Sequence, residues 1–273
     1  DRLTLRGASR EATIIRATNS DTLNPGSGSG QAPQEPGLLG GRALFLAQDS
    51  DLLELRDIAL HNTTLRSDGH SPQAETLFFN SPDGRLAVRN AHFSSEQDTL
   101  QLKGYAWIYK SLVEGNVDFV WGNNRITLFE DSEIRTVGDS ANPDSGGYIV
   151  QARTVGPAET GFVFLRSRLT GGPGPAGNLP PDGSAYLARS PGTANTWDHV
   201  AFVECTIGPH IAADGWLRRP APNPLQGGWR EYGNRAPDGQ PRHYGGAVLD
   251  ATQAARYRTR AAVFAGSGWD PQP

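Results

Sequence analysis

The sequence is poor in several residue types that other protein classes need. A single cysteine excludes an internal disulfide and gives no sign of a Cys–His catalytic pair, and methionine is absent. The six histidines have no metal-ligand spacing, so we expect no metal site and no cofactor. No apolar run is long enough to span a membrane. A net charge of −4 and a pI near 5.9 give no nucleic-acid-binding signal.

Helical periodicity is also absent from most of the chain, and a six-residue ladder takes its place. Apolar or small residues occupy its first, fourth and sixth positions between clusters of Gly, Asn, Asp and Ser, a pattern typical of short strands. The first members lie 33, 20, 21, 35 and 38 residues apart, which indicates a coil of about 20 residues lengthened by loops. The ladders are Leu55/Ile58/Leu60, Val88/Ala91/Phe93, Ile108/Ser111/Val113, Phe129/Ser132/Ile134, Phe164/Ser167/Leu169 and Phe202/Cys205/Ile207.

Repeating coils of this length predict an all-β fold, a right-handed parallel β-helix that forms one domain over residues 1–273. Three segments rich in Gly, Ser and Pro are expected to be long loops that build the walls of a cleft: Asn24 to Gly41, Gly171 to Gly183 and Pro220 to Pro241. Residues 250–266 are expected to form a C-terminal helix packed on the solenoid, with Asp250 as N-cap and Gly266 as its end.

Two aspartates share one phase of this repeat. Asp98 lies ten residues after Val88, and Asp118 lies ten residues after Ile108. Parallel coils would therefore stack the two carboxylates about 4.8 Å apart. A single Asp is more often a turn residue at a strand end, but two like charges at this spacing cannot both ionise cheaply, so one pKa should rise. Such a pair suits one general acid and one nucleophile.

Short segments around these aspartates form a recognisable set: Gln97-Asp98-Thr99-Leu100, Glu114-Gly115-Asn116-Val117-Asp118-Phe119-Val120-Trp121-Gly122 and Tyr186-Leu187-Ala188-Arg189. Shorter ones follow in the same order: Leu3-Thr4-Leu5-Arg6-Gly7, Asn62-Thr63, Gln73-Ala74, Gly215-Trp216, Gly233-Asn234 and Gly266-Ser267-Gly268-Trp269. Together they resemble the pectin methylesterases (pectinesterases) over nearly the whole chain. The resemblance implies a carbohydrate esterase that hydrolyses galacturonate methyl esters of pectin to free carboxylate and methanol through an aspartyl acyl-enzyme.

The resemblance also implies a role for five polar side chains. Asp118 matches the nucleophile, and Asp98 matches the general acid that later acts as base. Gln97 and Gln73 match the amides of the oxyanion hole, and Arg189 matches the guanidinium that orients the nucleophile. The chemistry is consistent, because a forked cation fixes a carboxylate and one oxyanion donor lowers a barrier by about 3 kcal/mol. Solvated surface polarity is the competing interpretation for the two glutamines and the arginine.

The chain departs from the family pattern at two places. Glu75 stands where an apolar residue is usual after Gln73-Ala74, and it would add negative charge near the site. Ser190-Pro191-Gly192 follows Arg189 in place of the family's Pro-Trp, so the usual sugar-binding tryptophan is missing. We expect Trp197 to replace it over the cleft, with simple loop packing as the alternative.

Two further aromatic residues are expected substrate contacts. Trp121 replaces the phenylalanine that is common in the family beside the nucleophile, and Tyr105 precedes the nucleophile strand. Aromatic faces of this kind accept the apolar faces of sugar rings. Ordinary packing is the competing interpretation for both residues.

The remaining expectations concern the setting of the protein. The resemblance implies pectin as partner, a secreted, periplasmic or cell-surface location, and a monomer. It also implies that the family's N-terminal cap and first coils, with a Gly-x-Tyr-x-Glu element, are missing before Leu3. Cys205 is expected to be a buried free thiol. Two alternatives stay open: an esterase or thioesterase of the same fold with another acyl substrate, which the altered segment after Arg189 favours, and a non-catalytic polysaccharide-binding solenoid.

Overall fold

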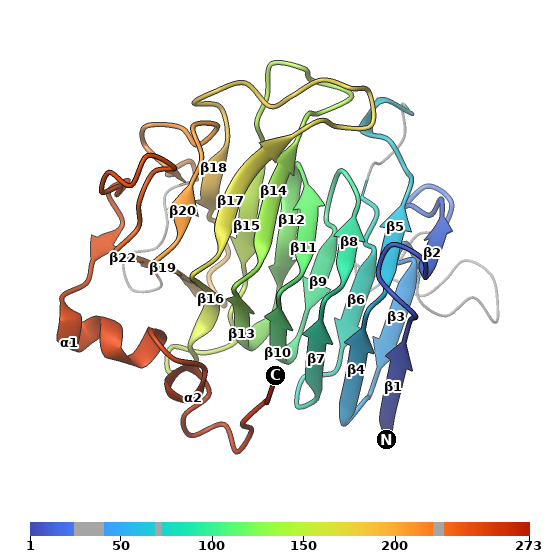
Figure 1. The fold of residues 1–273 in the computed structure, drawn as a ribbon, viewed down its shortest axis with the longest axis horizontal. Helices are drawn as coiled ribbons and strands as arrows, with labels where there is room; N and C mark the ends of the chain where they lie inside the picture. The colour runs from blue at the N-terminus through green and yellow to red at the C-terminus, as the bar shows by residue number, and fades with distance from the viewer. Residues whose placement is uncertain (25–40, 69–72, 221–226) are drawn as a thin grey trace.

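A computed structural model describes residues 1–24, 41–68, 73–220 and 227–273, and shows a parallel β-helix in which coil stacks on coil (Figure 1). Sheet A contains β1 (Arg2–Arg6), β4 (Leu52–Arg56), β7 (Arg85–Arg89), β10 (Gly104–Tyr109), β13 (Asn124–Glu130), β16 (Gly161–Leu165), β19 (Asp198–Val203), β22 (Gly227–Tyr232) and β23 (Ala247–Val248). Sheet B contains β2 (Ile14–Ala17), β5 (Ala59–Asn62), β8 (His92–Ser94), β11 (Leu112–Gly115), β14 (Glu133–Val137), β17 (Arg168–Gly172) and β20 (Thr206–Ile207). Sheet C contains β3 (Phe45–Gln48), β6 (Leu77–Asn80), β9 (Leu100–Leu102), β12 (Val117–Gly122), β15 (Tyr148–Ala152), β18 (Tyr186–Arg189) and β21 (Trp216–Leu217). The predicted fold class is confirmed.

The ladder residues stack in the register that the repeat predicts. The first members form one continuous row across sheet A: Leu55, Val88, Ile108, Phe129, Phe164 and Phe202. Along this row the three phenylalanine rings stack face to face, with centroids 4.7 and 4.5 Å apart. The ladders therefore form the inner core of the solenoid, and their periodicity is what holds successive coils in register.

A turn with one left-handed residue links each sheet A strand of the ladder to the next sheet B strand. The residue before each middle ladder position has φ between 48° and 55°: Asp57, Asn90, Lys110, Asp131, Arg166 and Glu204. The small middle residue then satisfies a buried donor, because the Ser111, Ser132 and Ser167 hydroxyls accept from the backbone N–H one coil earlier at 3.1–3.2 Å. This requirement explains why small polar residues interrupt the apolar ladder.

Cys205 occupies the same inward position in its coil as these serines. Its thiol is buried and free, as predicted, and its Sγ lies 3.3 Å from the carbonyl oxygen of Phe164. Burial raises the pKa of the Cys205 thiol to about 12, so the side chain acts as a small core residue.

The C-terminal segment differs from the single helix expected over 250–266. It contains α1 (Ala251–Ala254), the 3-10 turn η2 (Ala255–Tyr257) and α2 (Arg260–Val263). Asp250 caps α1 in a capping box with Gln253. The helix does not continue because Thr259 has an extended backbone and its side chain accepts from the N–H of Ala262, starting a new helix.

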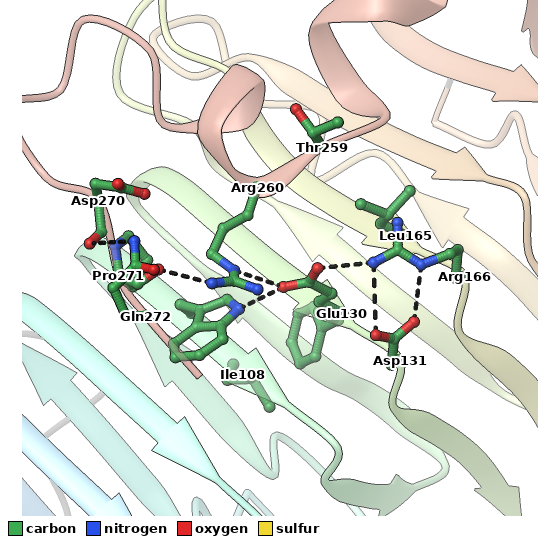
Figure 2. Close-up of polar contacts among 12 residues, drawn as sticks. Ile108, Glu130, Asp131, Leu165, Arg166, Thr259, Arg260, Asp270, Pro271 and Gln272 are labelled. Atoms are coloured by element: carbon green, nitrogen blue, oxygen red, sulfur yellow. Dashed lines mark hydrogen bonds and ion pairs between the residues drawn. The ribbon is translucent and has the colours of Figure 1, made fainter.

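This segment covers the outer face of sheet A. Tyr257, Val263 and Phe264 pack against Trp107 and its sheet neighbours in a second hydrophobic cluster. A buried carboxylate, Glu130, ties the layers together: it accepts from Arg260 at 2.8 Å and from Arg166 at 2.7 Å (Figure 2). The expected contact between the C-terminal segment and the coils thus has both an apolar and an ionic component.

The loop predictions have mixed outcomes. Asn24 to Gly41 lies almost wholly outside the described residues. Pro220 to Pro241 lies partly outside them, and its described part contains β22 instead of a continuous loop. The strand was missed because Gly227-Gly228 looks like a turn, although the indole of Trp229, next along the strand, stacks on Trp216 with ring centroids 5.1 Å apart.

Another short 3-10 turn, η1 (Arg66–Asp68), precedes β6. None of the helical segments in the described ranges has the length and apolar character needed to cross a bilayer.

Candidate active site

A polar pocket of about 280 Å³ opens on sheet C and contains most of the predicted site residues. Its lining includes Gln73, Gln97, Asp98, Asp118, Trp121 and Arg189. These side chains come from β12, β18 and the segments that precede β6 and β9, so four different coils contribute. Their convergence follows from the parallel register of the solenoid.

The two aspartates lie in adjacent coils at the same register. Gln97 pairs with Val117, and Leu100 pairs with Val120, which places Asp98 opposite Asp118. Both have a left-handed backbone, with φ of 61° and 47°, and both side chains are buried. Aspartate is one of the few residues that adopts this conformation readily. The structure therefore produces the pairing that the repeat predicts.

Asp118 is held by donors on both carboxylate oxygens. Arg189 donates from Nε to Oδ1 at 2.7 Å and from Nη2 to Oδ2. The amide of Gln151 also donates to Oδ2, at 3.1 Å. A forked guanidinium and an amide together fix the plane of the carboxylate, as an attacking group requires.

Asp98 has a different electrostatic environment. Burial raises the pKa of its carboxyl well above the ordinary value, and the negative charges of Glu75 and Asp118 raise it further. The Arg42 guanidinium, with Nη2 at 3.3 Å from Oδ2, acts in the opposite direction without overcoming burial. A carboxyl group whose pKa is raised in this way is suited to act as a proton donor.

The two glutamines are oriented by arginines. Arg42 donates from Nη1 to Oε1 of Gln73, and Arg66 donates from Nη1 to Oε1 of Gln97. Arg66 is itself fixed by Asp139, with 3.0 Å between Nε and Oδ2. Because both amide oxygens accept from cations, the amide NH₂ groups are the ends that can donate to a substrate oxygen.

Sequence reasoning missed three residues that line the same pocket: Arg42, Gln151 and Arg153. A signal was present for Gln151, because it is a polar residue within the buried strand β15 and pairs in register with Trp121. Arg153 lies two residues after Gln151, the spacing that puts two side chains on the same face of a strand. Its Nε donates to Gln151 Oε1 at 3.0 Å. No comparable signal marks Arg42, which lies outside the ladder pattern.

The three aromatic residues expected to contact substrate lie in different places. Trp121 lines the pocket, with the Arg153 guanidinium 4.8 Å and the Arg42 guanidinium 5.8 Å from its ring centre. Trp197 pairs with Thr154 through backbone hydrogen bonds in both directions, and it is not among the described residues that line the pocket. Tyr105 packs in the cluster under the C-terminal segment, on sheet A instead of sheet C. The structure therefore joins only Trp121 to the site.

Comparisons with known proteins point to one family. Residues 42–260 match the family model named Pectinesterase. A probable pectinesterase/pectinesterase inhibitor 64 of Arabidopsis thaliana is 26% identical over 190 residues, which cover 67% of this chain and 30% of that relative's length. The pectin methylesterase PemA from Erwinia chrysanthemi superposes with a TM-score of 0.76 at 20% identity, covering 98% of this chain and 83% of that one. A pectin methylesterase solved with a hexasaccharide superposes with a TM-score of 0.74 at 20% identity, covering 99% of this chain and 84% of that one. The family model spans most of the chain, and this chain therefore belongs to the pectinesterase family.

Proposed function

We propose that this chain hydrolyses galacturonate methyl esters of pectin to free carboxylate and methanol. The observation that carries the proposal is the stacked pair of buried aspartates. Asp118 accepts hydrogen bonds from Arg189, and the pKa of Asp98 is raised. Two carboxylates in different electrostatic states are what a nucleophile and a general acid require. Family membership and the polar lining of the pocket support the same substrate class.

In the first half of the reaction, a carboxylate oxygen of Asp118 attacks the carbonyl carbon of the methyl ester. The negative charge that develops on the carbonyl oxygen is stabilised by the amide NH₂ groups of Gln97 and Gln73. When the tetrahedral intermediate collapses, Asp98 gives its proton to the departing methoxy oxygen. Methanol leaves, and the galacturonyl group is joined to Asp118 as an anhydride.

In the second half, the deprotonated Asp98 removes a proton from a water molecule. The resulting hydroxide attacks the galacturonyl carbonyl and breaks its bond to Asp118. The products are the galacturonate carboxylate and a free Asp118, while Asp98 has regained its proton. Arg189 and Gln151 then hold Asp118 in position for the next ester.

The setting follows from the substrate. Pectin is a cell-wall polymer, so the enzyme that acts on it must reach it outside a cell, and we infer a secreted or cell-surface location. We expect a monomer, which sedimentation velocity can test. The single buried thiol of Cys205 is compatible with an oxidising environment because it has no cysteine to pair with within the chain.

The test is methanol release from highly esterified pectin by the wild-type chain and by Asp118→Asn. We expect the variant to lose about four orders of magnitude in turnover, because the nucleophile is gone. Glu130→Gln is the matched control, since it changes a buried, arginine-bound carboxylate outside the pocket. Wild-type protein that is folded but releases no methanol overturns the proposal.

A second candidate function is hydrolysis of another acyl ester or a thioester by the same chemistry. The observation that favours it is the altered wall: Ser190-Pro191-Gly192 follows Arg189, and Trp197 does not line the described part of the pocket. An aryl acetate and an acyl thioester should therefore be assayed beside pectin. Turnover of these substrates alone, dependent on Asp118, would assign the site to them.

A further inference from the structure

Arg42 is a buried cation in the lining of the pocket, with 3% of its surface exposed. Its Nε lies 2.7 and 2.9 Å from the two carboxylate oxygens of Glu75. Its Nη1 donates to Gln73, and its Nη2 lies 3.3 Å from Asp98 Oδ2. One guanidinium thus contacts the candidate oxyanion donor and the candidate general acid at once.

Glu75 is completely buried beside this arginine. Burial raises the pKa of the Glu75 carboxyl, and the charge and hydrogen bonds of Arg42 act against that rise. An isolated charge of either sign would be costly here, whereas the contacting pair is close to neutral as a unit. The unexpected glutamate after Gln73-Ala74 is therefore matched by an arginine more than thirty residues earlier in the chain.

Other charges also face Asp98. Asp118 lies opposite it in the adjacent coil. Arg153, directly after β15, and Arg189, in β18, also act on its charge. Asp21 also approaches Arg42, with 3.7 Å between Asp21 Oδ1 and Arg42 Nη1. Arg42 and Glu75 differ from these groups because Arg42 contacts Asp98 directly and Glu75 bonds Arg42 on two oxygens.

We propose that Arg42 is a positioning residue for Asp98 and Gln73 in the proposed ester hydrolysis, and that Glu75 neutralises it. The reason for the second residue is electrostatic. A lone arginine against Asp98 would stabilise the carboxylate and so oppose its role as an acid. With Glu75 bound to the same guanidinium, Arg42 can hold the two side chains while Asp98 keeps its proton for the leaving methoxy group.

The test is the pH dependence of methanol release from esterified pectin. In Glu75→Gln, Arg42 is no longer neutralised, so the pKa of Asp98 falls and the alkaline limb of the kcat profile moves to lower pH. Turnover above that limb should drop about tenfold or more, because less of the acid is protonated. Glu130→Gln should leave the profile in place. A Glu75→Gln profile that matches wild type would overturn the proposal.

Removing both Arg42 and Glu75 separates the positioning effect of Arg42 from its effect on the charge of Asp98. In Arg42→Met/Glu75→Leu, apolar side chains replace the ion pair, a change that buried pairs often tolerate without loss of stability. The alkaline limb should return toward that of wild type, while kcat should stay about 10 to 100-fold low because Gln73 and Asp98 have lost their support. Full kcat in this folded double variant would show that Arg42 positions nothing.

A failure of the proposed function can be told from a failure of this inference, which rests on it. If wild-type protein releases no methanol, the function fails, and the pair is then judged by the pH dependence of the free energy of unfolding. Wild type should lose stability as pH rises above the ordinary pKa of an aspartate, 3.8, because folded Asp98 holds its proton longer. That loss should be smaller in Glu75→Gln when each variant is compared with its own Asp98→Asn derivative. An unchanged loss would overturn the charge coupling without any activity assay.

Discussion

Two buried carboxyl groups in this solenoid, those of Glu130 and Asp98, have the same 4% exposure, but their pKa values are shifted in opposite directions. Glu130, on the outer face of sheet A, accepts from Arg166, Arg260 and the Trp107 indole, and these contacts lower the pKa of its carboxyl against the effect of burial (Figure 2). Asp98, in the sheet C pocket, contacts one arginine at 3.3 Å, and its pKa is raised well above the ordinary value. Burial alone therefore does not decide the state of the group.

The difference lies in how the positive charge is shared. Around Glu130, two guanidinium groups approach one buried carboxylate, and the neighbouring Asp131 is partly exposed. Around Asp98, the guanidinium in direct contact, that of Arg42, is already bound by Glu75, and a second carboxylate lies in the adjacent coil. The first arrangement favours the ionised carboxylate, whereas the second favours the protonated carboxyl, and perturbed groups of the second kind are typical of reactive sites.

The largest effect that sharpens this comparison is expected from Gln97→Ala. Loss of one oxyanion donor should lower kcat for methanol release about 100 to 1,000-fold, with little change in KM, because the amide acts on the charge of the transition state. Gln48→Ala is the matched control, since Gln48 is an exposed glutamine on β3 of the same sheet. Equal activity of the two variants would remove Gln97 from the oxyanion hole.

The contrast between the two clusters also marks what could be predicted from the sequence. The repeat alone placed Asp98 beside Asp118. The two residues have the same phase in the ladder and lie one repeat apart, so they occupy the same register in adjacent coils. It predicted nothing about Arg42 or the Glu75 contact, since a buried ion pair joins segments whose side chains follow no period. The resemblance to a family supplied the proposed roles of Gln97 and Arg189, which residue spacing by itself left open.

The sequence pattern also gives an incomplete prediction for the C-terminal segment on the outer face of sheet A. The composition of residues 250–266 indicated a helix with Asp250 as its cap, and that cap is present. The break at Thr259 depends on one side chain competing for a backbone donor, a local choice that average helix propensity does not resolve. Tyr105 likewise precedes β12, the strand of Asp118, in sequence, but it lies on sheet A because the coil turns between the two strands.

A smaller effect, on stability instead of turnover, is expected from Glu130→Gln. The free energy of unfolding at pH 7, measured by urea titration, should fall by about 2 to 3 kcal/mol, because Arg166 and Arg260 lose their common partner. Since the folded pKa of Glu130 is lowered, its contribution is present above the ordinary value of 4.5 and is lost as pH falls through the folded pKa. The difference from wild type should therefore shrink in acid. Methanol release per folded molecule should not change.

The smallest expected change in the free energy of unfolding has the opposite sign and comes from Asp98→Asn. Because the folded pKa of Asp98 is raised above 3.8, wild type binds more protons folded than unfolded in that range, and its stability falls as pH rises from 3.8 toward the folded pKa. Asparagine does not titrate, so the variant escapes this loss and should be more stable at pH 7 by about 1 kcal/mol, while its turnover collapses. Below pH 3.8 the pH-dependent part of the difference should vanish. If urea titrations show Asp98→Asn destabilised in the way that Glu130→Gln is, then Asp98 is a structural ion-pair partner and the contrast between the two carboxylates fails.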